Sequence, residues 1–182
     1  MKTLENDLIT TVEEWPASTV EERVRRLEDV RSIGEVVAHY ARCVDNRDGA
    51  GAASVFAEDG SLVCPGAPPI CGRAKLAKLY GRLLAPITAS THAVSNLQVC
   101  VTGPDSAKAH CVLWAWDGYG EGLDLAAPAD QFSFGRYELD LVREADGEWR
   151  VQTMNINFAG QTGKDGRFAE HLNRPWPPEP AA

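Results

Sequence analysis

The sequence predicts an α+β fold in which N-terminal helices precede a curved antiparallel sheet. In the first half of the chain, apolar side chains recur at three- and four-residue steps, the spacing of a helix with one buried stripe. From Thr91 onward the apolar period becomes two, which indicates strands. Because helices come first and strands later, we expect the sheet to wrap around the helices and to leave a pocket between them.

Four helices are expected in the first half of the chain. The run Ser18-Thr19-Val20-Glu21 has a capping-box pattern, which favours the start of a helix. Asp48-Gly49 is typical of a helix stop followed by the N-cap of a second, short helix. The helices are expected at residues 18–30, 32–44, 50–56 and 74–84.

The second half predicts an antiparallel meander joined by Gly-, Pro- and Asp-containing turns and by a long loop over residues 117–130. The strands are expected at residues 60–63, 92–101, 107–116, 131–143 and 149–158. We divide the chain into an N-terminal extension (1–17), one domain (18–160) and a C-terminal tail (161–182). A helical turn at 168–172, before a Pro-rich end, is expected to act as a lid over a pocket.

Composition narrows the function classes. The chain has 182 residues, 44% of them hydrophobic, and no apolar run long enough to cross a bilayer, so a single globular domain without a membrane span is expected. A formal charge of −8 argues against nucleic acid as a partner. The five cysteines are scattered and the four histidines are not grouped, so we expect no metal site, no cofactor and a reducing cytoplasm.

Tyr40 and Asp45 lie at the end of the expected second helix. Tyr40 belongs to its inward stripe, so its hydroxyl is either satisfied within the core or donates a hydrogen bond into a cavity. Asp45 has no capping role and lies one turn beyond Tyr40. It can reach the same cavity, or it can be a solvated carboxylate at the helix end.

His92 opens the expected strand over residues 92–101, and its orientation is ambiguous. Strict alternation places one set of side chains on the first face of the strand: His92, Val94, Asn96 and Gln98. The other set lies on the second face, which alternation favours as the core: Ala93, Ser95, Leu97 and Val99. His92 is then a surface histidine, unless a β-bulge, a feature common beside active sites, turns it inward.

Four segments in the same order resemble a known family. They are 39–48 (HYARCVDNRD), 55–60 (VFAEDG), 90–96 (STHAVSN) and 135–149, which runs from Gly-Arg-Tyr to Asp-Gly-Glu-Trp. Together they are similar to the SnoaL-like branch of the nuclear-transport-factor-2-like superfamily, over about residues 20–158. The resemblance implies a cone-shaped barrel in which the sheet wraps the N-terminal helices.

The resemblance also implies a site and a range of functions. Relatives include scytalone dehydratase, bile acid 7α-dehydratase, ketosteroid isomerase, polyketide cyclases and non-catalytic dioxygenase subunits, so the fold does not determine the function. Tyr40, Asp45 and His92 fall on the site positions of the bile acid dehydratase. Cys64 stands where ketosteroid isomerase has its catalytic base. Two of these relatives have a further acidic or basic site residue at a position that falls near Trp116. Here the adjacent Asp117 is either a substitute or a turn residue; otherwise the group is missing, or the substrate is bulkier and more apolar there.

We therefore expect a cofactor-independent dehydratase, isomerase or cyclase for a small apolar carbonyl compound of polyketide, steroid or terpenoid type. His92 would remove a proton next to the carbonyl, Tyr40 would donate to the enolate oxygen, and Asp45 would orient the imidazole. Substrate contacts are expected from Asn96, Trp114, Trp116, Phe134 and Met154, although each of the apolar four can equally be a core residue. The alternative is a non-catalytic binding or oligomer-forming subunit. In either case we expect a homodimer or homotrimer formed through the sheet.

Overall fold

The computed structural model describes residues 15–17, 19–64, 66–120 and 130–162. Residues 163–182 of the C-terminal tail, with the expected turn and lid, lie outside the described residues, as does most of the N-terminal extension. The elements are α1 (Val20–Asp45), α2 (Gly49–Ser54), β1 (Phe56–Val63), β2 (Ile70–Cys71), α3 (Arg73–Leu84), β3 (Ala89–Gly103), β4 (Ser106–Gly118), β5 (Gln131–Arg143) and β6 (Trp149–Gln161). None of the described helices is long and apolar enough to cross a membrane.

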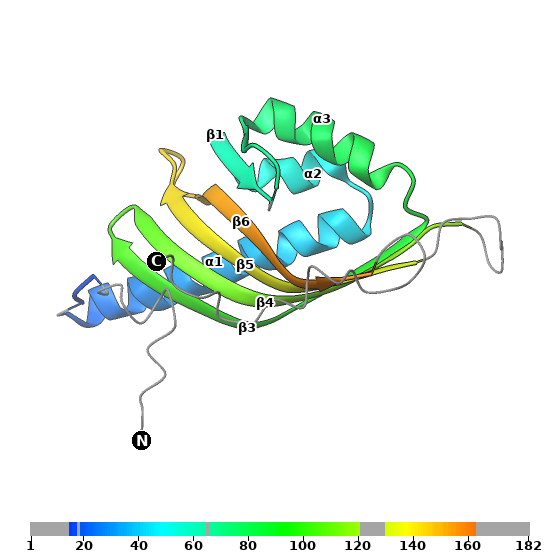
Figure 1. Cartoon of the computed structure of the whole chain (residues 1–182). Coiled ribbons are helices and arrows are strands. Elements are labelled where there is room, and N and C mark those ends of the chain that lie inside the picture. Colours follow the sequence, from blue (N-terminus) through cyan, green and yellow to red (C-terminus); the bar gives the residue numbers. More distant parts are fainter. Residues whose placement is uncertain (1–14, 18, 65, 121–129, 163–182) are drawn as a thin grey trace, which may run out of the picture.

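The sheet confirms the α+β cone, with two differences from the expected antiparallel barrel. Its strand order is β2-β1-β6-β5-β4-β3, so the sheet is open and not closed into a barrel. The pair β1–β6 is parallel, whereas the neighbouring strands among β3, β4, β5 and β6 pair antiparallel. Figure 1 shows α1 lying along the curved sheet, with α2 and α3 at the end of the molecule that holds β1.

Helix α1 is one continuous helix, whereas the sequence predicted two. A capping box is present one residue later than the expected Ser18–Glu21 pattern: Thr19 N donates to Glu22 Oε2 at 2.9 Å, and Glu22 N donates to Thr19 Oγ1 at 3.1 Å. Ser32 and Gly34 lower helix propensity, but neither removes a backbone donor as proline would, so the helix continues through them. The buried stripe then extends over the second half of the helix, at Ile33, Val37, Tyr40, Ala41, Cys43 and Val44.

The short helix α2 has the predicted N-cap but ends earlier than expected. The Asp48 side chain accepts a hydrogen bond from Gly51 N at 2.8 Å. The helix ends at Ser54, because Phe56 already pairs with Val151 of β6 in the parallel ladder. Strand β1 is therefore longer than the predicted 60–63 segment.

A β-bulge in β3 reverses which face of the strand is buried. The pairing with β4 shifts register between Ser95 and Gln98, and Asn96 lies within this shift with φ 52°, in the left-handed region. Before the bulge, His92 and Val94 face inward and Ala93 is exposed. The face that alternation favoured as core was therefore wrong for this half of the strand. The bulge predicted for an inward His92 is present, four residues beyond the histidine.

Strands β4 and β6 extend further than expected. β4 continues to Gly118 and β6 to Gln161. Asp117 consequently lies within a strand, paired with Ser90 and Gln131, and is not the first residue of a loop. This places the Asp117 carboxylate beside the N-terminal half of β3.

Candidate active site

His92 and Asp45 form a hydrogen-bonded pair between β3 and the end of α1. The His92 Nδ1 atom lies 2.8 Å from Asp45 Oδ1, and the His92 backbone N–H donates to Asp45 Oδ2 at 3.1 Å. The His92 side chain is 11% exposed and that of Asp45 27% exposed, so the imidazole is the more enclosed partner. Two hydrogen bonds from one residue to one carboxylate fix the orientation of the ring.

Two further side chains join this pair. Ser90 Oγ lies 2.8 Å from Asp117 Oδ1, 3.3 Å from Asp45 Oδ1 and 3.3 Å from His92 Nδ1. Ser90 and His92 are two residues apart on one strand, so their side chains share the inner face, and Asp117 is the direct partner of Ser90 on β4. The four residues form a polar cluster, named below the His92 cluster: Asp45, Ser90, His92 and Asp117.

Tyr40 lies in a second, buried cluster of aromatic side chains. Its hydroxyl is 3.1 Å from that of Tyr80, and its ring meets Phe56, Tyr80 and Tyr137 edge to face at centroid distances of 5.8 to 6.3 Å. Burial raises the pKa of Tyr40 to about 12. The hydroxyl therefore stays protonated at neutral pH and is available as a hydrogen-bond donor.

Electrostatics connect the two clusters. Burial raises the pKa of Tyr137 well above its ordinary value, and nearby Tyr40, Cys111, Asp117 and Asp45 raise it further. The two carboxylates of the His92 cluster therefore lie within electrostatic range of a tyrosine that touches Tyr40. No direct hydrogen bond between Tyr40 and either His92 or Asp45 is present among the described contacts.

The inner face next to His92 is apolar. His92 pairs with Ala115, and the adjacent row of the sheet carries Val94, Leu113 and Phe158. Leu113 is buried, whereas Val94 and Phe158 are half-buried and pack against the core. A ligand that contacts the His92 imidazole therefore meets hydrocarbon on this side.

The side chains expected to contact substrate lie elsewhere. Leu113 and Ala115 are buried, so alternation turns Trp114 to the outer face of the sheet, where it is 58% exposed. Phe134, its direct partner on β5, stacks on it at 5.1 Å, and Trp116 lies one pair further along the same face. Met154 is 1% exposed in the core, and Asn96 is exposed at the bulge. None of the five is in contact with His92 among the described contacts.

The comparison with known protein families identifies the family of this chain. Residues 25–155 match the SnoaL-like domain family, a span well over half of the chain. The chain belongs to this family. No curated protein matches the sequence.

Solved structures share the SnoaL-like fold at low sequence identity. A putative scytalone dehydratase from Novosphingobium aromaticivorans is 20% identical, with a TM-score of 0.67 over 75% of this chain and 88% of that one. A hexachlorocyclohexane dehydrochlorinase (LinA) type 2 is 19% identical, with a TM-score of 0.67 over 77% and 91%. A ketosteroid isomerase-like protein from Erwinia carotovora atroseptica is 17% identical, with a TM-score of 0.60 over 72% and 96%.

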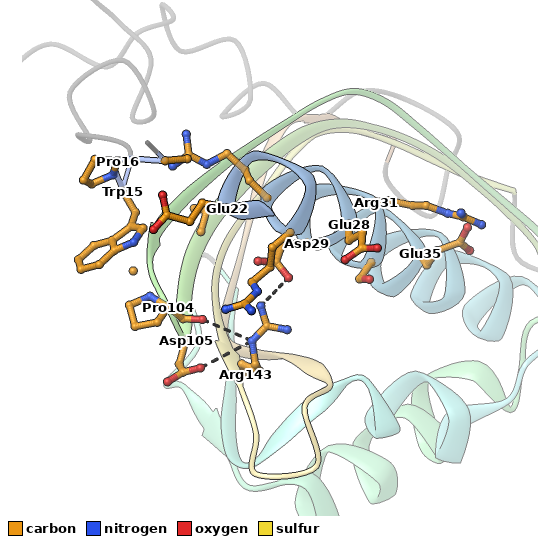
Figure 2. Close-up of a pocket in the computed structure, with 16 residues that line it drawn as sticks. Trp15, Pro16, Glu22, Glu28, Asp29, Arg31, Glu35, Pro104, Asp105 and Arg143 are labelled. Carbon is orange, nitrogen blue, oxygen red and sulfur yellow. Dashed lines mark hydrogen bonds and ion pairs between the residues drawn. The ribbon is translucent and has the colours of Figure 1, made fainter. Parts of the chain in front are cut away.

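Two surface cavities of this SnoaL-like domain lie apart from the His92 cluster. A groove of about 960 Å³ lies beside the start of α1. Figure 2 shows Arg143 in this groove, bonded to Asp29 and to the Pro104–Asp105 turn. A second cavity of about 480 Å³ includes the exposed His39. Neither cavity is lined by Tyr40, Asp45 or His92. Their charged walls carry both signs.

The cysteines and potential metal ligands do not add a further centre. All five cysteines are unpaired thiols. Cys64 is close enough to Tyr40 and Tyr80 to contribute to their raised pKa values, after the larger effect of burial. Among the described residues, no three His, Cys, Asp or Glu side chains are grouped as metal ligands.

Sequence reasoning did not identify Ser90, Tyr80 or Tyr137 as site residues. Ser90 is part of the quoted 90–96 segment, and its two-residue spacing from His92 places both on one face, so this signal was present in the sequence. Tyr80 continues the four-residue spacing of Leu76 and Leu84 on α3, which indicates an inward position. No local signal predicts that their hydroxyls meet Tyr40 or Asp117.

Proposed function

We propose that this chain is a cofactor-independent lyase or isomerase that removes a proton next to the carbonyl of a small apolar compound, with His92 as the general base. One observation carries the proposal: the hydrogen bond of 2.8 Å between His92 Nδ1 and Asp45 Oδ1. This bond supports the tautomer in which Nδ1 carries the hydrogen. The lone pair of Nε2 is then free to accept a proton.

The chemistry follows from this tautomer. Nε2 accepts a proton from the carbon next to the substrate carbonyl, and the electron pair of the broken C–H bond moves into the enolate. Asp45 stabilises the imidazolium that results. In a dehydratase, the imidazolium returns the proton to a β-hydroxyl, which leaves as water. In an isomerase, it returns the proton to a different carbon.

The tyrosine cluster supports a role in binding the developing enolate. Tyr40 and Tyr80 are both protonated at neutral pH, and burial raises the pKa of each further above its ordinary value. A hydroxyl held in a dry site stabilises an oxyanion more than it does in water. The apolar row beside His92 favours a substrate of polyketide, steroid or terpenoid type over a highly charged one.

The relatives support the same reaction class. The names of two similar structures describe eliminations, a dehydratase and a dehydrochlorinase, and a third describes an isomerase. Elimination and isomerisation next to a carbonyl both begin with proton removal from carbon, so one base can serve both.

A substrate screen tests this proposal. The purified protein is incubated with β-hydroxyketones and β,γ-unsaturated ketones of one to four rings, and the formation of conjugated enone is followed by absorbance. We expect turnover of at least one apolar member without added metal or cofactor. Binding of panel members without turnover of any would count against catalysis and favour the second candidate.

The second candidate is a non-catalytic subunit that assembles through its sheet, and one observation favours an assembly of some kind. The outer face carries an aromatic patch, in which Trp114 and Phe132 are exposed and the half-buried Phe134 stacks on Trp114. Exposed apolar patches of this kind favour protein–protein contacts. We propose a homodimer or homotrimer through this face, with or without catalysis.

Light scattering tests the assembly. Trp114→Asp should convert the oligomer to monomer, because a carboxylate replaces an indole at the centre of the patch. Leu83→Asp is the matched control, since Leu83 is also about half exposed but lies on α3. A wild-type protein that is monomeric at working concentration would refute the interface.

A further inference from the structure

The His92 cluster contains more negative charge than a His–Asp pair requires. Two carboxylate oxygens, Asp45 Oδ1 and Asp117 Oδ1, lie within hydrogen-bond distance of the single Ser90 hydroxyl. We propose that Ser90 is a positioning residue that holds the Asp117 carboxylate toward the His92–Asp45 pair, so that a second negative charge stabilises the imidazolium formed during turnover. This inference rests on the proposed function, in which His92 is the base.

Counting hydrogens assigns the donors. Ser90 has one hydroxyl hydrogen, and its shortest contact is the 2.8 Å bond to Asp117. Asp45 receives the His92 backbone N–H at Oδ2 and the ring Nδ1–H at Oδ1. With its hydrogen directed to Asp117, the Ser90 oxygen presents a lone pair to Nδ1, at 3.3 Å. Each hydrogen in the cluster then has an acceptor, and Asp117 is oriented without competing for the His92 hydrogen.

The same contacts allow the hydroxyl to respond to the charge of His92. When His92 is neutral, the Ser90 hydrogen can also turn toward Asp45 Oδ1, at 3.3 Å. When Nε2 gains a proton, the Nδ1–H bond to Asp45 becomes charge-assisted and the Ser90 hydrogen turns to Asp117. Ser90 thus satisfies one carboxylate or the other in both protonation states.

The surroundings contain no described cation that neutralises this cluster. Asp45 bonds His92 from α1, and Asp117 bonds Ser90 from β4. Tyr119, just beyond β4, lies near Asp117, and Tyr137 of β5 lies near both carboxylates. The Arg47 guanidinium, just beyond α1, donates to the backbone carbonyls of Ile87 and Thr88 and not to either carboxylate. A proton on His92 is therefore the cation that the two carboxylates can share.

Variants at both ends of the Ser90–Asp117 hydrogen bond test the inference. Ser90→Ala removes the hydroxyl, and Asp117→Asn removes the charge with little change in shape. Ser90→Thr retains a hydroxyl and should behave as wild type. Ser95→Ala is the matched control, because Ser95 lies on the same strand but is exposed on the opposite face.

The first readout does not require a substrate. The NMR signals of the His92 ring are followed against pH in each variant. We expect the midpoint of their change to move to lower pH by about 0.5 to 1 unit in both Ser90→Ala and Asp117→Asn, because Asp117→Asn removes a charge that stabilises the imidazolium and Ser90→Ala no longer holds that charge in place. Ser90→Thr and Ser95→Ala should leave it unchanged. An unchanged midpoint in Asp117→Asn, which retains the hydroxyl and the packing, would overturn the inference.

The second readout is turnover of the substrate found by screening. Ser90→Ala and Asp117→Asn should lower kcat by about tenfold with KM little changed, and should move the acidic limb of the pH profile to lower pH. Normal kcat in both variants would overturn the inference. If the NMR midpoint moves but His92→Gln turns over normally, the charge coupling stands and the proposed function fails. If His92→Gln is inactive but no midpoint moves, the proposed function stands and the role of Ser90 fails.

Discussion

Replacing Tyr40 with Phe removes one buried oxygen from the contact between α1 and α3. The hydroxyl of Tyr80 loses its partner at 3.1 Å, while the ring packing against Phe56 and Tyr137 is retained. Loss of a buried hydrogen bond costs about 1–2 kcal/mol of unfolding free energy. For a chain of this size, this lowers the midpoint of thermal unfolding by roughly 2–8 °C.

The pKa of Tyr40 adds a dependence on pH. Burial raises this pKa from its ordinary value of 10.0 to about 12, so the folded state keeps the phenol neutral while an unfolded tyrosine begins to ionise near pH 10. The resulting stability is fully present below pH 10 and is lost as the pH rises to about 12. The two-unit shift corresponds to about 2.7 kcal/mol of unfolding free energy. Tyr40→Phe does not lose this stability in alkali, because it has no phenol to ionise at this position.

Urea unfolding followed by tryptophan fluorescence measures both effects. Wild type should be the more stable protein at pH 7, and the difference should shrink or reverse as the pH approaches 12, because only wild type has the Tyr40 phenol to ionise. The other tyrosines and thiols titrate in both proteins. Tyr119→Phe is the control, since Tyr119 is only half-buried. Equal stability of wild type and Tyr40→Phe at pH 7, with equal losses in alkali, would refute the buried-donor account of Tyr40.

Two further pairs of substitutions test the fold. Gly135→Ala should destabilise the protein by about 3 kcal/mol in urea unfolding, because a Cβ there would lie 2.0 Å from a carbonyl oxygen of β6. Gly81→Ala, with open space around its Cβ, should stabilise α3 by about 0.5–1 kcal/mol. Asp29→Ala should cost about 3 kcal/mol in the same assay, because it leaves a half-buried arginine and a buried tryptophan N–H without their shared carboxylate. Exposed Glu28→Ala should change stability by less than about 0.5 kcal/mol.

Local patterns were sufficient for most of the elements. The Asp48 N-cap and the switch of period near Thr91 are short-range signals that the structure confirms, and the capping box lies one residue later than predicted, at Thr19 and Glu22. The parallel pairing of β1 with β6 joins segments about ninety residues apart, such as Ser61 and Thr153, and no local pattern encodes it. The continuity of α1 was missed because a single Ser and a single Gly resemble a helix stop.

The candidate site was predictable only in part, and β3 shows why. Residue types and spacing singled out Asp45 and His92, but the inward direction of His92 depends on where the bulge at Asn96 falls. Alternation alone placed His92 on the surface. Trp114 was expected to contact substrate but lies on the outer face of the sheet; a large aromatic side chain in a strand suits a pocket and an interface equally well. Only the burial of the neighbouring Leu113 and Ala115 shows which face of the sheet Trp114 occupies.

The most direct test of the central claim is proton exchange from carbon. A small apolar ketone is incubated in D₂O with the protein, and deuterium incorporation next to the carbonyl is followed by NMR. Wild type should accelerate the exchange, and His92→Gln should slow it by about 10²- to 10⁴-fold while the ketone still binds. His110→Gln, on the outer face, should exchange as wild type does. Exchange by His92→Gln at the wild-type rate would contradict the assignment of His92 as the base.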